Sequence, residues 1–192
     1  EDISAENGRI VRVFKRENGQ KAYLRIYNDM YVHPFESEIT AALKTLVDKS
    51  PLIAFVTGHG ERACDDFGDR GYAAFAKNPT FRNALINQGF RVQDLTLEQP
   101  VPDNVDVLVI SDMKVPFTPE EFVNYSSFVD KGGNLIILGE VKRQKNMNPI
   151  VGILGLRFAD GILVAPSKQY LDDVIAARIT EGALKASPYF AQ

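Results

Sequence analysis

The feature that most constrains the fold is a continuous apolar run, Leu52-Ile53-Ala54-Phe55-Val56, that leads directly into Thr57-Gly58-His59-Gly60-Glu61. A strand without polar positions is covered on both faces, as the strands of parallel sheets are. Parallel strands are joined by long crossover connections, which are usually helices. We therefore expect residues 52–56 to form a central strand in a soluble α/β domain.

Strand-like and helix-like segments alternate after this run. Apolar spacing at Phe81, Leu85 and Ile86 predicts a helix, which Gly89 caps. An interrupted alternation over residues 90–97 indicates an edge strand, and residues 105–110 and 134–138 predict two further strands. This order predicts a three-layer, doubly wound, mostly parallel sheet of the flavodoxin-like or amidotransferase-like kind over residues 51–165.

The clearest helix start is Thr118-Pro119-Glu120-Glu121. It combines a capping box, in which threonine and glutamate satisfy each other's backbone amides, with proline at the first helical position. Phe122, Tyr125 and Val129 are expected on the buried face of this helix, and Gly132-Gly133 ends it.

Residues 1–50 predict a β-hairpin followed by a helix. Residues 9–14 and 21–27 alternate around Asn18-Gly19, a dipeptide typical of two-residue turns, and Ala22, Leu24 and Ile26 are expected to share the apolar face. The helix opens at Phe35 and ends before Pro51. Its apolar face is predicted by the spacing of Ile39, Leu43, Leu46 and Val47.

The C-terminal part carries weaker patterns. Asn148-Pro149 predicts a short helix that ends near Gly155, and residues 156–165 predict two short strands around Asp160-Gly161. Residues 166–192 are interpreted as a C-terminal helical segment, helical from 170 to 186 with an interruption at Thr180-Glu181-Gly182. The chain opens with Glu1-Asp2 and has no basic or apolar leader, so we expect a piece cut from a longer protein, truncated at this end too.

Charge and cysteine content exclude several classes of function. The net charge is -3 and the sequence pI about 5.5, so there is no basic field to attract nucleic acid. The single cysteine, Cys64, excludes an internal disulfide and a multi-cysteine zinc site. The phosphate-binding glycine fingerprints are absent, and with two histidines far apart no metal spacing exists. We expect neither a cofactor nor a metal.

In a parallel sheet, ligands bind at the carboxyl ends of the strands. Three of the expected strands end in polar or glycine residues, which should therefore meet at one edge of the sheet. The predicted binding residues are Thr57, Gly58, His59, Gly60, Glu61, Arg62, Ser111, Asp112, Gly139 and Glu140.

Two interpretations of residues 57–61 remain open. The glycines free the backbone to turn its amides toward an anion, with an imidazole and a carboxylate alongside. Alternatively, the glycines only permit the turn, and His59 caps or fills space. A nucleophile pair of His59 with Cys64 is disfavoured, because Asp65 and Asp66 beside the thiol oppose thiolate formation. Residues 68–71 are interpreted as a loop, and the basic run 142–145 as an anion site or a solvated loop.

The order of features also resembles a known family. The marks are Thr57-Gly58-His59-Gly60-Glu61, Gln88-Gly89-Phe90-Arg91-Val92, the stretch from Val101-Pro102 to Ile110, Phe117 to Glu140 with its Gly-Gly-Asn, and Asn148 to Arg157. Over roughly residues 9–165 the chain is similar to the extracytoplasmic domain of the gliding-motility-type auxiliary family of ABC transporters, components of ABC-2 export systems.

The resemblance implies a fold related to glutamine amidotransferase-like and intraflagellar-transport domains. It also implies a periplasmic location on a bacterial membrane, with membrane helices outside this segment, and partnership with membrane-embedded and ATPase subunits. The leading hypothesis is a non-enzymatic domain that binds a small molecule, a glycan or a partner protein at the His59 edge. The alternative is an amidotransferase- or hydrolase-like enzyme that uses His59 with Glu61 or Cys64. A third hypothesis is an assembly scaffold with interfaces on residues 9–27 and the C-terminal helix.

Overall fold

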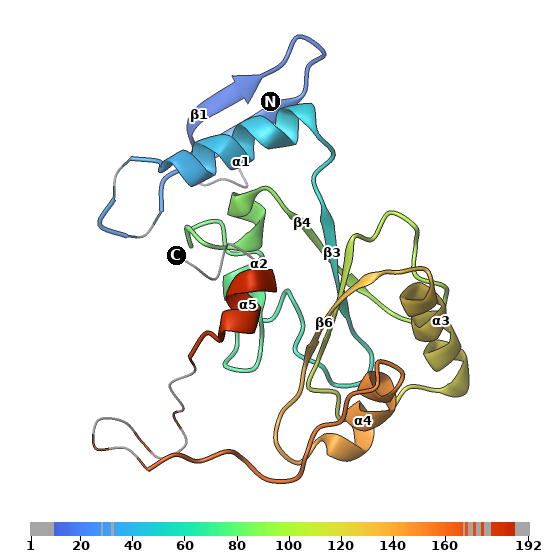
Figure 1. Ribbon diagram of the computed structural model, residues 1–192. Coiled ribbons are helices and arrows are strands. Elements are labelled where there is room, and N and C mark those ends of the chain that lie inside the picture. The colour runs from blue at the N-terminus through green and yellow to red at the C-terminus, as the bar shows by residue number, and fades with distance from the viewer. Residues whose placement is uncertain are drawn as a thin grey trace. The chain divides into compact units, whose positions relative to one another are not determined.

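The computed structural model describes residues 10–27, 29–31, 33–166, 168, 171, 174 and 178–186. The chain divides into two compact units, Glu1–Phe158 and Ala159–Gln192. The first unit holds an antiparallel hairpin and a separate four-stranded parallel sheet (Figure 1). No helix in the described part of the chain is long and apolar enough to cross a membrane.

The predicted hairpin is present, but its turn is longer than expected. Strands β1 (Ile10–Lys15) and β2 (Lys21–Arg25) pair antiparallel. The Arg16 amide donates to the Gln20 carbonyl at 2.9 Å, so three residues, 17–19, form the loop rather than two. Gly19 takes the positive φ of +89° that ends this type of loop. The strand ends at Arg25, and Ile26 is therefore exposed rather than buried with Ala22 and Leu24.

Helix α1 (Glu36–Val47) packs its Ala42 and Leu46 against Ala22 and Leu24 of the hairpin. The predicted apolar face is confirmed at Leu46 and Ile39, which lie in or against this core, whereas Leu43 and Val47 are exposed and Glu38 is buried. The Arg82 guanidinium donates to both carboxylate oxygens of Glu38 at 2.6 Å. Glu38 can be buried on this face of the helix because its charge is paired. The spacing of apolar residues does not reveal such a position.

The main sheet has the strand order β4-β3-β5-β6, all parallel. Its strands are β3 (Leu52–Val56), β4 (Arg91–Leu95), β5 (Val107–Ser111) and β6 (Asn134–Leu138). The chain steps from β3 to one side and then crosses to the other, so the strand order reverses between β3 and β5. Every residue of β3 is buried, and β4 is an edge strand, both as predicted.

Each face of the sheet carries its own core. On one face, helices α3 (Pro119–Asp130) and α4 (Gln144–Gly152) bring Tyr125, Phe128, Met147 and Ile150 onto the strands (Figure 1). The other face is covered by short turns, α2 (Ala73–Ala76) and the 3-10 turn η2 (Leu85–Gln88). The structure is thus mixed α/β, and a complete three-layer doubly wound arrangement remains a prediction.

Several predicted elements differ in length. The helix expected around Phe81–Ile86 shrinks to η2, although Gly89 closes it at a φ of +85° as predicted. The capping box of α3 is confirmed, and so is its buried face: Tyr125 is buried, and Phe122 and Val129 are partly buried against the same core. Glu121 and Phe128 are buried as well, which was not predicted. Helix α4 begins at Gln144, before the predicted Asn148.

The two strands predicted within residues 156–165 do not form. In the second unit, α5 (Glu181–Ala186) begins where an interruption was predicted, because the Thr180 hydroxyl accepts the Ala183 amide at 3.2 Å and caps the helix. Much of the helix predicted over residues 170–180 lies outside the described residues.

Candidate functional site

The loop after β3 is held mainly by its backbone. Gly58 and Gly60 adopt positive φ angles of +118° and +73°, which only glycine takes without strain. The Thr57 amide donates to Leu95 at 2.9 Å, which keeps the loop in line with β4. The His59 carbonyl accepts the amides of Lys114 and Val115 at 2.9 and 3.1 Å, which joins the loops that follow β3 and β5.

The side chain of His59 points into the protein. Its Nδ1 lies 3.2 Å from Glu61 Oε1, and its Nε2 lies 3.0 Å from Glu121 Oε2. Phe117 packs edge-on against the ring at 5.0 Å between centroids, and His59 is only 7% exposed. We name these three residues, His59, Glu61 and Glu121, the histidine clasp. Both ring nitrogens are occupied, so the clasp joins the loop after β3 to the start of α3.

Glu121 has two tasks in this arrangement. One carboxylate oxygen accepts the Thr118 amide at 2.8 Å, which completes the capping box, and the same oxygen faces His59. Burial raises the pKa of Glu121, but the hydrogen bonds from Thr118 and His59 outweigh burial and lower the pKa below its ordinary value. The ionised carboxylate therefore belongs to the folded state.

A second group of charges lies at the same sheet edge and reaches the surface. Its acidic members are Asp112, directly after β5, and Glu140, just after β6. Arg62 binds Glu140 at 3.0 Å, Arg70 binds Asp112 as well as Glu140, and Arg143 binds Asp112 at 3.1 Å. We name these five residues, Arg62, Arg70, Arg143, Asp112 and Glu140, the arginine cluster.

The two acids of the cluster differ in burial and in pKa. Asp112 is buried, and burial raises its pKa, as does the hydrogen bond it shares with Glu140. That shared hydrogen bond, followed by Arg70, lowers the pKa of the more exposed Glu140 to about 2. Burial and the neighbouring acid thus move the two carboxyl pKa values apart, upward for Asp112 and downward for Glu140. Asp112 also has a positive φ of +49°, a conformation in which aspartate is among the less strained residues.

The residues predicted at this edge thus divide into two sets. His59 and Glu61 are drawn inward, whereas Arg62, Asp112 and Glu140 join the cluster. Ser111 lies between them, and its hydroxyl donates to the Arg62 carbonyl at 3.3 Å. Gly139 is needed for space, because a Cβ there would lie 2.6 Å from the ring of Phe158.

Sequence reasoning missed three participants. Arg70 was interpreted as part of a loop, yet its guanidinium bridges Asp112 and Glu140. Arg143 sits in the basic run 142–145, for which both an anion site and a solvated loop were considered, and it binds Asp112. Glu121 was recognised only as a capping residue. Its position at the start of a helix that follows an edge loop was the one available signal.

Cys64 is separated from the clasp by the sheet. The thiol lies fully buried in the apolar core on the α2 face, with Ile53 and Phe55. The clasp, in contrast, contacts Phe117 and α3, which belong to the opposite face. Burial raises the pKa of the Cys64 thiol to about 11, and the neighbouring Asp94 also raises it. A thiol in these surroundings is a poor nucleophile at neutral pH.

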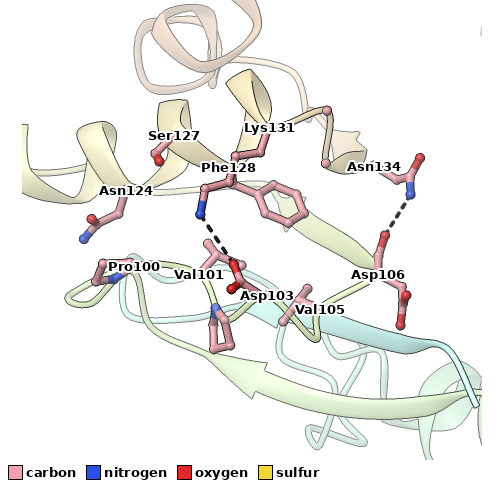
Figure 2. Close-up of a pocket in the computed structure, with 13 residues that line it drawn as sticks. Pro100, Val101, Asp103, Val105, Asp106, Asn124, Ser127, Phe128, Lys131 and Asn134 are labelled. Carbon is pink, nitrogen blue, oxygen red and sulfur yellow. Dashed lines mark hydrogen bonds and ion pairs between the residues drawn. The ribbon is translucent and has the colours of Figure 1, made fainter. Parts of the chain in front are cut away.

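A distinct cavity of about 270 Å³ lies at the opposite end of the sheet, where β5 and β6 begin. In Figure 2, Phe128 of α3 points into it, and Lys131 reaches across to Asp103 at 3.4 Å. None of the predicted site residues line this cavity. Among the described residues, no group of three or more histidine, cysteine, aspartate or glutamate side chains is arranged to hold a metal ion.

The chain thus contains an α/β domain in which the polar loops lie together at the carboxyl ends of the parallel strands. A family model described as an ABC-type uncharacterized transport system matches residues 50–163, more than half of the chain. The chain therefore belongs to this auxiliary family of ABC-type transport systems. No curated protein and no solved structure matches the chain. The matched residues span the sheet from β3 to β6 and include both the clasp and the cluster.

Proposed function

We propose that this chain is a non-enzymatic binding domain of an ABC-type transport system, and that it binds a ligand or partner through the arginine cluster. The observation that supports this proposal is the convergence of three guanidinium groups on two carboxylates at the carboxyl edge of the sheet. This is the edge at which open parallel sheets bind ligands, next to the point where the strand order reverses.

The cluster has the chemistry of an exchangeable ion-pair surface. Arg70 is 48% exposed and Glu140 is 36% exposed at their side chains, so both are accessible from solvent. A guanidinium presents a planar fork of donors that matches carboxylates and phosphates. An anionic group from a ligand or a partner subunit can replace Glu140 as the acceptor for Arg62 and Arg70, because exposed ion pairs are held only weakly.

The surroundings of His59 and Cys64, the two residues on which an enzyme would depend, support a non-enzymatic role. Both nitrogens of His59 face carboxylates within the protein, which leaves neither free to take a proton from a substrate. Cys64 is buried on the other face of the sheet, with a raised pKa. The alternative enzyme, which uses His59 with Glu61 or Cys64, would first have to open the clasp.

The proposed partners are the membrane-embedded and ATPase subunits of the transport system, and the proposed location is the periplasmic face of the membrane. The family match associates the chain with an ABC transport system. The finer relation to gliding-motility-type exporters and to amidotransferase-like domains rests on the sequence resemblance. A glycan or a small anionic molecule is the proposed ligand class if the domain binds cargo rather than a subunit.

The test compares Arg70→Gln with Arg91→Gln, which alters an exposed arginine at the amino end of β4. The readout is co-purification of the chain with the membrane-embedded and ATPase subunits proposed as its partners, followed by titration of the isolated chain with the subunit retained. We expect Arg70→Gln to weaken association about tenfold or more, as loss of a central arginine does at protein interfaces, and Arg91→Gln to leave it unchanged.

Equal association by the two variants would contradict the proposed surface. A further variant, Cys64→Ser, addresses the enzyme alternative, because it removes the thiol without touching the cluster. The proposal requires full association by this variant. Turnover of an ester or amide substrate by the wild type that Cys64→Ser or His59→Gln abolishes would instead support the enzyme.

A further inference from the structure

Strand β6 has the composition of a central strand but lies at the edge of the sheet. Its five residues, Asn134–Leu138, include no charge and no proline. It pairs with β5 on one side, and no described strand pairs with its other side. Natural edge strands are normally protected by charges, prolines or covering segments, because an open edge accepts another strand.

The opposite edge of the same sheet shows the usual protection. Strand β4 carries Arg91, Gln93 and Asp94 within five residues. Asp94 also binds Lys77 at 3.5 Å, which places a charged pair at this edge. The charged residues of β4 therefore oppose the addition of another strand at that edge of the sheet. Strand β6 carries no charged residue that would do the same.

Both faces of β6 are apolar and incompletely covered. Ile136 and Leu138, which share the α2 face with Val109, are 46% and 41% exposed, because α2 and η2 cover the other strands. On the α3 face, Leu135 and Ile137 line an open hollow of about 430 Å³ together with Leu154, Leu156 and Phe158. Exposed apolar surface that is continuous around an open edge marks an interaction surface.

We propose that β6 pairs antiparallel with β6 of a second copy of this chain, around a two-fold axis at Ile136. The pairing joins two four-stranded sheets into one and places Ile136 opposite its counterpart on the same face. In such an isologous contact each copy offers the same surface to the other, which an uncharged strand permits without like-charge repulsion.

The charges that flank β6 fit this arrangement. The carboxyl end of the strand carries Arg62, Arg70 and Arg143 against Asp112 and Glu140, an excess of one positive charge. The amino end carries Lys131, which binds Asp103, together with Asp106, an excess of one negative charge. Antiparallel pairing centred on Ile136 brings the carboxyl end of one copy beside the amino end of the other, so opposite charges meet at both ends of the interface, whereas a parallel pairing of two copies would bring equal charges together.

Disulfide crosslinking tests this pairing directly. The only native cysteine, Cys64, is fully buried, so a new surface cysteine reacts without competition. The variant Ile136→Cys places a thiol at the proposed axis, and Val123→Cys places one on the exposed side of α3 as the matched control. Under mild oxidation we expect Ile136→Cys to form a covalent dimer at least about tenfold faster than Val123→Cys, since paired cross-strand residues lie within disulfide reach.

Sedimentation of the untagged chain over a range of concentrations gives the second measurement. We expect a reversible dimer, and we expect Ile136→Glu to weaken it about tenfold or more while Val123→Glu leaves it unchanged. A wild type that stays monomeric at all concentrations overturns the proposal. If the β6 amides of such a monomer are protected from hydrogen exchange, another part of the same chain covers this edge. Equal crosslinking rates of Ile136→Cys and Val123→Cys would also overturn the proposal.

Discussion

Two carboxylates face the two ring nitrogens of His59, at 3.2 and 3.0 Å, and the ring has little access to water. Each polar atom of this buried ring therefore has a partner within hydrogen-bonding distance, as buried polar groups require. At the scale of single residues, the clasp is thus a structural device. Its energetic contribution depends on the ionised form of Glu121, and pH is the natural variable with which to test it.

The first prediction concerns acid stability. Because the pKa of Glu121 in the folded state lies below its ordinary value of 4.5, its ionised form contributes stability that is present above about pH 4.5. That contribution is lost as the pH falls through the folded-state pKa. Between about pH 6 and about pH 3, the free energy of unfolding should therefore fall more steeply for the wild type than for Glu121→Gln.

Urea denaturation at each pH measures the difference. Glutamine retains the capping-box geometry, so the comparison isolates the ionisation. Glu120→Gln, an exposed change in the same turn of α3, is the control and should follow the wild type. Parallel curves for the wild type and Glu121→Gln would show that the clasp does not depend on this carboxylate.

The second prediction concerns Cys64. A fully buried thiol whose pKa is raised to about 11 should be unreactive in the native protein at neutral pH. We expect modification by a thiol reagent to occur only as the chain unfolds, with a rate that rises with denaturant. Cys64→Ser combined with Ser37→Cys, which puts a thiol at an exposed position of α1, should react at once. Fast native labelling of Cys64 would contradict its placement in the core.

At the scale of elements, the turn between α3 and β6 depends on close packing. Phe128 near the end of α3 packs across the backbone of Gly133, and the same phenylalanine lines the cavity in Figure 2. Gly132 supplies a positive φ of +81°, which lets the chain reverse directly into β6. The two glycines thus serve different purposes, one conformational and one steric.

The third prediction follows from the steric role. A Cβ at residue 133 would lie 2.3 Å from the ring of Phe128, so Gly133→Ala must displace a side chain of the core. We expect a loss of about 1–3 kcal/mol in the free energy of unfolding, as overpacking usually costs. Gly152→Ala at the end of α4 meets no atom within 4 Å and is the control, expected to be neutral or slightly stabilising. Equal stability of the two variants in denaturation would show that Phe128 has room to move.

At the scale of the whole first unit, a buried ionic group links the hairpin and α1 to the main sheet region. Arg82 donates to Glu38 at 2.6 Å and to Asp29 at 2.7 Å, and its guanidinium lies 4.2 Å from the ring centroid of Phe35. The hydrogen bond to Asp29 raises the pKa of Arg82, and Glu38 does so too, against the effect of burial. The cation is therefore fixed between elements that are far apart in the sequence.

The fourth prediction is that Arg82→Met lowers the free energy of unfolding by about 3–5 kcal/mol, because it leaves Glu38 buried without its partner. The double variant Arg82→Met with Glu38→Gln should recover part of this loss, since it removes the uncompensated charge as well. Denaturation of the wild type, Arg82→Met, Glu38→Gln and the double variant completes the cycle. A double variant less stable than Arg82→Met would show that the loss comes from packing rather than from charge.

The same residues show how far sequence reasoning reaches. Local signals predicted the capping box at Thr118, the central strand from Leu52, the edge position of β4 and the glycine cap at Gly89. Each of these depends on residues within a few positions of one another. On the buried face of α1, Ile39 and Leu46 were predicted correctly, but Glu38 was not, because its carboxylate is compensated by a residue 44 positions away.

The candidate site follows the same division. Strand ends predicted which loops share an edge, since the carboxyl ends of parallel strands converge. Their partners could not be predicted, because Glu121 lies 62 positions from His59 and Arg70 lies 42 positions from Asp112. The choice between a histidine that faces solvent and one that faces the interior depends on those distant carboxylates.

The hydrogen bonds accepted by the His59 carbonyl have a consequence for natural variation at this loop. Lys114 and Val115 bind the main chain of residue 59, and any amino acid supplies that carbonyl. The positive φ angles at Gly58 and Gly60, in contrast, are properties of those two side-chain-free positions. We therefore expect related sequences to keep the two glycines, which the loop conformation requires. His59 can be replaced in such sequences when Glu61 and Glu121 are replaced with it.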